Sequence, residues 1–189
     1  MTSARRLHYS YEDYLRALEM NDVKLEFCDG VIYAMAGGTP AHAALSAAAI
    51  RHLGNALAGR CIAYSSDLSV RIDATDLSTF PDASVICGPI ETSTMDKNAA
   101  TNPALVVEVT SRPTEDDDRG EKLSHYKQLP SLKAVLFVSH RTPRVTLVER
   151  TPQGWDEREF RAGETVTIAE PACTLPVDAL YSGITLDQA

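Results

Sequence analysis

The sequence predicts an α/β protein in which helices flank one mixed central β-sheet. Hydrophobic residues make up 44% and charged residues 23% of the 189 positions, which is typical of a globular chain and not of a disordered one. Two nearly continuous apolar runs, at 104–109 and 134–138, are typical of strands that are buried on both faces. Segments with helical patterns lie between the strand-like segments. The length predicts a single domain over 1–189, with its core at about 9–150 and short strands at about 151–184.

An N-terminal helix and a β-hairpin are expected before the core. Residues 10–13 read Ser-Tyr-Glu-Asp, a capping box that predicts a helix as far as about Glu19. Residues 23–27 then alternate apolar and polar side chains, as a half-buried strand does. The Asp-Gly pair at 29–30, followed by an apolar return at 31–35, predicts a tight hairpin.

The rest of the chain predicts two further helices and several strands. Thr39 caps a helix with Pro40 at its first position, over about 41–58, because proline suits the first turn of a helix. Another helix is expected from about 114–118 to Leu129, just before Pro130. Segments 61–64, 68–72, 81–87 and 144–149 read as strands, whereas 73–79 and 88–102 read as polar loops.

Several classes of protein are disfavoured by what the sequence lacks. No apolar run is long enough to predict a membrane-spanning helix, and the first residues contain no apolar stretch typical of an export signal, so we expect a cytoplasmic protein. The sequence contains no HExxH, GxSxG, GxGxxG or GxxxxGK[ST] motif, which disfavours zincins, α/β-hydrolases, Rossmann enzymes and P-loop enzymes. The four scattered cysteines are expected to be buried and reduced.

Glu108 is the most informative residue, because it interrupts a run of buried apolar residues. Burying a carboxylate is costly unless a charge or hydrogen bonds compensate for it. Strand alternation places Val106, Glu108 and Thr110 on one face. An ordinary buried glutamate, satisfied by hydrogen bonds or by an arginine, remains an alternative to a functional one.

Asp82 is the second candidate, at the start of the strand predicted over 81–87. Carboxylates on neighbouring strands meet at about 4–5 Å if they share a face. Since like charges so close repel, a bound cation is the natural way to keep both ionised, and oxygen ligands favour Mg²⁺ or Mn²⁺. A turn or capping role for Asp82 is the alternative.

The predicted helix after Glu108 supplies a third candidate. Asp118, Lys122 and Tyr126 are spaced four residues apart, so they share one helix face. Lys122 can then reach the carboxylates and offset charge that develops on a phosphate. The alternative is a surface ion pair between Asp118 and Lys122.

Together these residues resemble the PD-(D/E)XK nuclease superfamily, and most closely its Uma-type branch of restriction endonucleases. The resemblance covers about Tyr9 to Ile184. Its motifs, in chain order, are a Glu-containing hairpin at 25–30, His42 after a Gly/Pro break, Pro81-Asp82, the segment 107–114 that begins Val-Glu-Val-Thr-Ser, and Asp118 with Lys122 and Tyr126.

The resemblance implies a restriction-endonuclease-like fold and a Mg²⁺- or Mn²⁺-dependent endonuclease that cuts DNA with a metal-activated water. Because cutting both strands needs two active sites, we expect a homodimer. We expect Asp82, Glu108 and the carbonyl of Val109 to hold the metal, and the resemblance implies that Glu26 is a further active-site acid. Thr110 stands where the superfamily motif has lysine, so the resemblance implies that Lys122 supplies the ammonium group. From the sequence alone, Glu26 is slightly better explained as an exposed strand residue, and His42 as a structural or exposed one.

The charge distribution leaves the nature of the partner open. The net charge is −8, which does not suggest a protein that binds nucleic acid over its whole surface. Residues 119–150 nevertheless hold two acidic and seven basic residues: Arg119, Lys122, Lys127, Lys133, Arg141, Arg144 and Arg150. They predict either a strip that meets DNA phosphates or an ordinary scatter of surface charge. Two other functions remain open, a nuclease fold that binds DNA or a protein without cutting, and a hydrolase of small phosphate esters.

Overall fold

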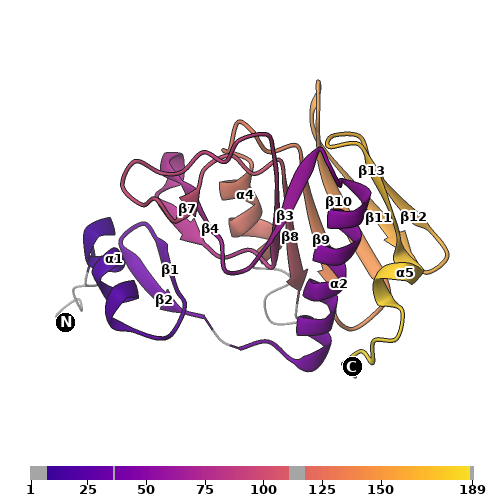
Figure 1. The fold of residues 1–189 in the computed structure, drawn as a ribbon, viewed down its shortest axis with the longest axis horizontal. Helices are drawn as coiled ribbons and strands as arrows, with labels where there is room; N and C mark the ends of the chain where they lie inside the picture. The colour runs from indigo at the N-terminus through magenta and orange to yellow at the C-terminus, as the bar shows by residue number, and fades with distance from the viewer. Residues whose placement is uncertain (1–7, 36, 111–117, 188–189) are drawn as a thin grey trace, which may run out of the picture.

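The computed structural model describes residues 8–35, 37–110 and 118–187. In these residues the predicted mixed central sheet, flanked by helices, is confirmed. The main sheet has the spatial order β11-β10-β9-β8-β6-β3. At its centre, β8 (Leu105–Thr110) runs parallel to β9 (Ala134–Ser139), and all residues of both strands are buried. The other pairings in this sheet are antiparallel (Figure 1).

The main sheet extends further along the chain than the sequence predicts. Its remaining strands are β3 (Cys61–Ser65), β6 (Ala83–Cys87), β10 (Arg144–Thr151) and β11 (Gly154–Arg161). Short strands outside the core were expected after residue 150, whereas β11 has eight residues and pairs with β10 along its whole length. Most side chains of β11 are exposed, so no alternation of apolar residues indicates this strand in the sequence.

The predicted N-terminal helix and hairpin are both present. Helix α1 (Tyr11–Met20) begins at the predicted capping box, in which Ser10 and Asp13 bond each other's backbone N–H groups. The hairpin joins β1 (Leu25–Cys28) to β2 (Val31–Ala34). Its two turn residues, Asp29 and Gly30, have φ values of 43° and 78°, the left-handed backbone that a two-residue Asp-Gly turn needs.

A second sheet, which the sequence does not predict, holds this hairpin in place. Its spatial order is β2-β1-β5-β4-β7, and it includes β4 (Ser69–Ile72), β5 (Leu77–Thr79) and β7 (Ala99–Ala100). A short 3₁₀ turn at Asp73–Thr75 connects β4 and β5. Thus the polar loops expected at 73–79 and 88–102 each contain a buried strand. The strand that carries Glu26 is therefore fixed between two neighbours.

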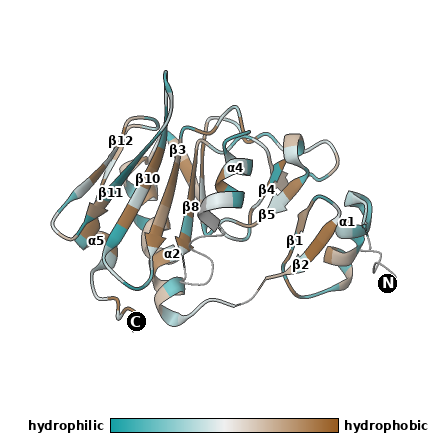
Figure 2. Cartoon of the chain, turned by 180° about the vertical axis from the view of Figure 1, so that it is seen from behind, coloured by the Kyte–Doolittle hydropathy of each residue, from teal (hydrophilic) through white to brown (hydrophobic). Residues whose placement is uncertain are grey.

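Apolar layers cover both faces of the main sheet. Helix α2 (Pro40–Ala56) starts at the predicted cap, Thr39, and packs on one face together with β12 (Thr165–Ile168), β13 (Cys173–Pro176) and α5 (Val177–Tyr181). The second sheet and α4 (Leu123–Tyr126) cover the other face. Figure 2 shows hydrophobic colouring concentrated in the strands of the main sheet. The alternation predicted for β8 is confirmed, because Val107 and Val106 belong to opposite layers.

The helix after β8 differs in form from the predicted one. Residues Asp118–Lys122 form a π-helical turn that leads into α4, and α4 ends at Tyr126 instead of Leu129. The expected start at 114–117, the acidic residues 116 and 117, and the end of the 107–114 motif fall on 111–117, outside the described residues.

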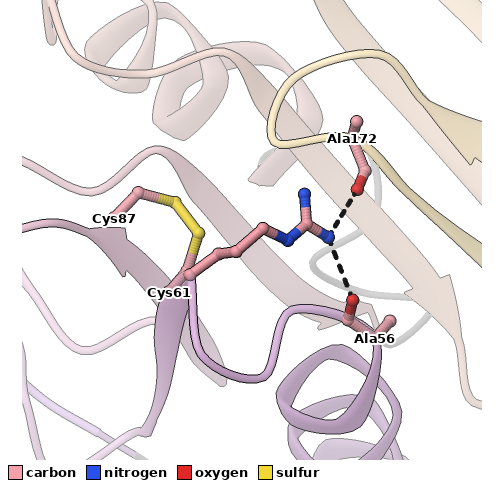
Figure 3. Close-up of a disulfide and its surroundings, with 5 residues drawn as sticks. Ala56, Cys61, Cys87 and Ala172 are labelled. Atoms are coloured by element: carbon pink, nitrogen blue, oxygen red, sulfur yellow. Dashed lines mark hydrogen bonds between the residues drawn. A yellow bond between two sulfur atoms is a disulfide. The ribbon is translucent and has the colours of Figure 1, made fainter.

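The prediction that all cysteines are reduced is wrong in the structure. Cys61 and Cys87 face each other across β3 and β6, with 4.1 Å between their Cα atoms, and form a disulfide (Figure 3). Cys28 and Cys173 are free and partly buried. Near the disulfide, Arg60 Nη2 donates to the carbonyls of Ala56 and Ala172, 3.1 and 2.9 Å away. No described helix combines the length and apolar character needed to cross a membrane.

Candidate active site

Asp82 and Glu108 lie opposite each other where β6 meets β8. The antiparallel register pairs Ala83 with Val107, so continuing it by one residue places Asp82 opposite Glu108. Both residues line one cavity of about 430 Å³. The two carboxylates that the sequence singles out therefore line the same cavity.

Asp82 is held firmly by three neighbours. Its Oδ2 accepts a hydrogen bond from the Val109 N–H at 2.7 Å and lies 3.2 Å from His42 Nε2. Its Oδ1 accepts from the Ser46 hydroxyl at 3.0 Å. In an extended strand the N–H and C=O of one residue point to the same side. The carbonyl of Val109 therefore faces the edge on which Asp82 lies.

Glu108 is nearly inaccessible to solvent, with 7% of its surface exposed. The Tyr126 hydroxyl donates to its Oε1 at 2.5 Å, and Lys122 Nζ lies 3.6 Å from the same oxygen. Burial raises the pKa of Glu108 to about 7; the charge of Lys122 opposes this shift and that of Asp82 adds to it. Desolvation therefore outweighs the ammonium group of Lys122, and an ionised Glu108 calls for further positive charge.

Lys122 and Glu26 complete the group of predicted residues. Lys122 Nζ lies 3.1 Å from Glu26 Oε1, and Glu26 also accepts hydrogen bonds from the Thr79 hydroxyl and, at 3.3 Å, from the Phe80 N–H. Glu26 is therefore largely buried in the cavity and is not the exposed strand residue that its sequence context slightly favours. The ammonium group comes from the helical segment after β8, while Thr110 is buried in β8.

Two histidines at the cavity were missed or undervalued by sequence reasoning. His42, expected to be structural or exposed, sits in the first turn of α2 against Asp82, and this hydrogen bond raises the pKa of His42. His140 also lines the cavity, with its Nδ1 3.2 Å from Asp187 Oδ2. It directly follows β9, the parallel neighbour of β8. A polar residue at the carboxyl end of a parallel strand is the signal that indicates such a position.

Three of the basic residues of segment 119–150 have local partners in the structure. Arg150 donates to the backbone carbonyls of 127, 129 and 132. Lys133 pairs with Glu170, and Arg144 with Glu159. These three cations have separate local partners, and the strip that meets DNA phosphates stays a prediction beside the alternative of scattered surface charge.

The oxygens at the meeting point of β6 and β8 fit a hard divalent cation. They comprise the carboxylates of Asp82 and Glu108 and the carbonyl of Val109, a set that suits Mg²⁺ or Mn²⁺ and contains no sulfur. The raised pKa of Glu108 agrees with this fit, because a cation would offset the unfavourable burial of its charge.

Comparison with known proteins places the chain in a family. Residues 11–178 match the family model Uma2, described as "Putative restriction endonuclease". The chain belongs to the Uma2 family. It is 34% identical over 177 residues to the uncharacterized protein slr1290 of Synechocystis sp., covering 93% of this chain and 92% of that one. It is 28% identical over 134 residues to the uncharacterized protein sll1609 of the same organism, covering 70% of this chain and 76% of that one.

A solved structure shares the fold of this Uma2 chain. It is described as the crystal structure of "a putative nuclease belonging to DUF820" from Anabaena variabilis. The TM-score is 0.70 with 16% sequence identity, and the match covers 87% of this chain and 93% of the other. The restriction-endonuclease-like fold implied by the sequence resemblance is therefore confirmed, and the Uma2 chain is nuclease-like in family and fold.

Proposed function

We propose that this Uma2 protein is a Mg²⁺- or Mn²⁺-dependent endonuclease that hydrolyses phosphodiester bonds of DNA. The observation that carries the proposal is the convergence of Asp82, Glu108 and Lys122 on one cavity. Two carboxylates from adjacent strands, with an ammonium group at 3.6 Å from one of them, suit the transfer of a phosphoryl group to water. The acidic walls of the cavity call for a cation between protein and phosphate.

In this proposal Asp82, Glu108 and the Val109 carbonyl hold the divalent cation. When bound, the cation supplies positive charge beside the scissile phosphate and lowers the pKa of a water molecule. Lys122 directs its ammonium group at the attacked phosphate and offsets the negative charge that develops there. Glu26 positions Lys122 through its contact at 3.1 Å, and Tyr126 and His42 orient Glu108 and Asp82, respectively.

A plasmid-nicking assay tests this function. With Mg²⁺ or Mn²⁺ present, we expect the purified protein to convert supercoiled plasmid to nicked or linear DNA, and chelation to stop the reaction. The variants Asp82→Ala and Glu108→Ala are each expected to reduce cutting to background, because each loses a carboxylate ligand. Arg158→Ala serves as the control, since its side chain pairs with Glu149 and Asp156 and does not line the cavity.

Three other results, from this assay and from parallel DNA-binding and model-substrate assays, would count against the proposal. Undiminished cutting by both alanine variants would refute the site. DNA binding without metal-dependent cutting would favour a nuclease fold that only binds DNA or a protein. Hydrolysis of a small aryl phosphodiester, but not of DNA, would favour a hydrolase of small phosphate esters.

We further propose that residues 1–189 form one nuclease domain and that two copies act together as a homodimer. Cutting both strands of a duplex needs two active sites, and a two-fold dimer is the commonest way to provide them. Light scattering of the purified protein is expected to give twice the 20.5 kDa mass of one chain. A monomer that still makes double-strand breaks in a single encounter would contradict this part of the proposal.

We also propose that the protein acts in the cytoplasm, where DNA is accessible to it. The disulfide between Cys61 and Cys87 bears on the proposed location, because thiols in the cytosol are normally kept reduced. Cys61 and Cys87 occupy facing positions on β3 and β6. Alkylation in intact cells is expected to label both residues, with the disulfide forming after lysis. Protection of both from alkylation in intact cells would indicate an oxidising compartment.

A further inference from the structure

A second cavity lies beside the candidate active site and contains a different set of ligand groups. Its volume is about 340 Å³, and Lys122 and Glu26 line it as well as the first cavity. Within it, Cys28 Sγ, His125 and a carboxylate oxygen of Glu121 all lie within 4.8 Å of one another. The distance from Cys28 Sγ to His125 Nε2 is 3.8 Å. None of these three residues takes part in the proposed cleavage.

We propose that Cys28, Glu121 and His125 form a separate site for a thiophilic transition-metal ion, Zn²⁺ in the first instance. A thiolate, an imidazole and a carboxylate are all established ligand types for zinc. Zn–S and Zn–N bonds of about 2.3 and 2.0 Å in a tetrahedron place sulfur and nitrogen about 3.5 Å apart, and the observed 3.8 Å is close to that separation.

The elements that carry the ligands are already fixed close together. Cys28 ends β1 and is paired with Val31 of β2 and Leu77 of β5. His125 lies on α4 between Leu123 and Tyr126, both of which are buried. Binding therefore requires small side-chain adjustments and no movement of the backbone elements. Glu121 is the exposed member of the group, so the cluster is open to solvent on the side where Glu121 lies.

The electrostatic surroundings also favour a cation at this place. The pKa of Cys28 is raised, first by burial and then by the negative charges of Glu121, Asp29, Asp76 and Glu26. The negative charges of these four carboxylates attract a divalent ion to the place where Cys28, His125 and Glu121 meet. Sulfur and nitrogen ligands distinguish this site from the all-oxygen set of Asp82, Glu108 and Val109, so the two sites select different metals.

A metal here would connect the two elements that supply Glu26 and Lys122. Cys28 is two residues from Glu26 on β1, and Glu121 directly precedes Lys122. A bound ion would therefore fasten the lysine-bearing segment to the hairpin. An effect on DNA cutting would rest on the proposed function, whereas metal binding itself does not.

The test is a titration with Co²⁺, which replaces zinc and reports thiolate ligands by a charge-transfer band in the near ultraviolet. The full-length protein is used with its Cys61–Cys87 disulfide intact, so that the free thiols are Cys28 and Cys173. We expect the band in the wild type, its displacement by Zn²⁺, and its loss in Cys28→Ser. Cys173→Ser is the matched control and is expected to keep the band, because Cys173 lies in β13 and does not line this cavity.

A ligand that bears no sulfur provides a second, independent variant. His125→Ala is expected to raise the Kd for Zn²⁺, measured by calorimetry, by about 100-fold or more. Circular dichroism checks that each variant is folded. No charge-transfer band in the folded wild type, or an unchanged band in Cys28→Ser, would overturn the proposal. The Asp82→Ala and Glu108→Ala variants are expected to keep the band, so a failure of the nuclease proposal and a failure of this one are distinguishable.

Discussion

Glu108→Gln is expected to stabilise the metal-free protein above neutral pH while abolishing DNA cutting. In the folded protein burial raises the pKa of Glu108 to about 7, against an ordinary value of 4.5. Between these values the unfolded chain has lost this proton while the folded chain keeps it. The unfolded state then binds fewer protons, so the stability contributed by this group falls as the pH rises from 4.5 to about 7 and is constant above that.

The size of this effect follows from the same shift. One pKa unit corresponds to about 1.4 kcal/mol, so an ionised, buried Glu108 costs on the order of 3 kcal/mol. Glutamine has nearly the same shape and no charge, so the variant avoids this cost. Denaturant unfolding in a chelator is therefore expected to show the variant and the wild type nearly equal at about pH 4 and the variant more stable at about pH 8.

Two comparisons make the Glu108 prediction specific. Glu91→Gln is the control, because Glu91 is exposed and is expected to leave the pH dependence of stability unchanged. Adding Mn²⁺ at about pH 8 is expected to raise the unfolding temperature of the wild type but not that of Glu108→Gln, since ligands that bind only the folded state stabilise it. A variant less stable than the wild type at both pH values would contradict the assignment of Glu108 as a buried metal ligand whose charge destabilises the metal-free protein.

Lys122→Ala is expected to lower DNA cutting by about 100-fold or more, which is typical when a charge-stabilising group at a reacting centre is removed. Its Nζ lies 3.1 Å from Glu26 Oε1 and 3.6 Å from Glu108 Oε1. Deleting the ammonium group removes a competing positive charge from the acidic cavity. The Kd for Mn²⁺ is therefore expected to fall, or at least not to rise, while cutting is lost.

Loss of DNA cutting without loss of Mn²⁺ binding separates a role of Lys122 in the reaction from a role in folding. A misfolded variant would lose metal binding together with activity. Lys127→Ala is the matched control, since Lys127 lies next to the same helical segment with its Nζ 5.7 Å from the centre of the Trp155 ring and outside the cavity. Wild-type cutting by Lys122→Ala, or loss of Mn²⁺ binding in it, would contradict the proposed role.

Features governed by local chemistry were predictable from the sequence. The Ser10–Asp13 capping box, the turn at 29–30 and the start of α2 at Thr39 each depend on contacts between residues close in the chain. The alternation around Glu108 was equally readable, because a strand of six buried residues has only two faces. That Asp82 lies near Glu108 depends in addition on the pairing of β6 with β8 in the register that places Ala83 opposite Val107, which strand alternation alone does not give.

Features that depend on distant contacts were not predictable in the same way. Strands β5 and β7 have three and two residues, too few to show a periodic pattern, and their neighbours in space define them. The disulfide between Cys61 and Cys87 requires the register of β3 against β6, which sequence spacing does not give. The position of Lys122 followed from the family resemblance more than from helical spacing, since its segment is π-helical.

The most direct measurement is a crystal of the protein soaked in Mn²⁺, with the ion located by its anomalous scattering. Our account predicts a peak within about 2.3 Å of a carboxylate oxygen of Asp82 and of one of Glu108. A peak bound to only one of these residues, or none at this place while Mn²⁺ supports DNA cutting in solution, would contradict it.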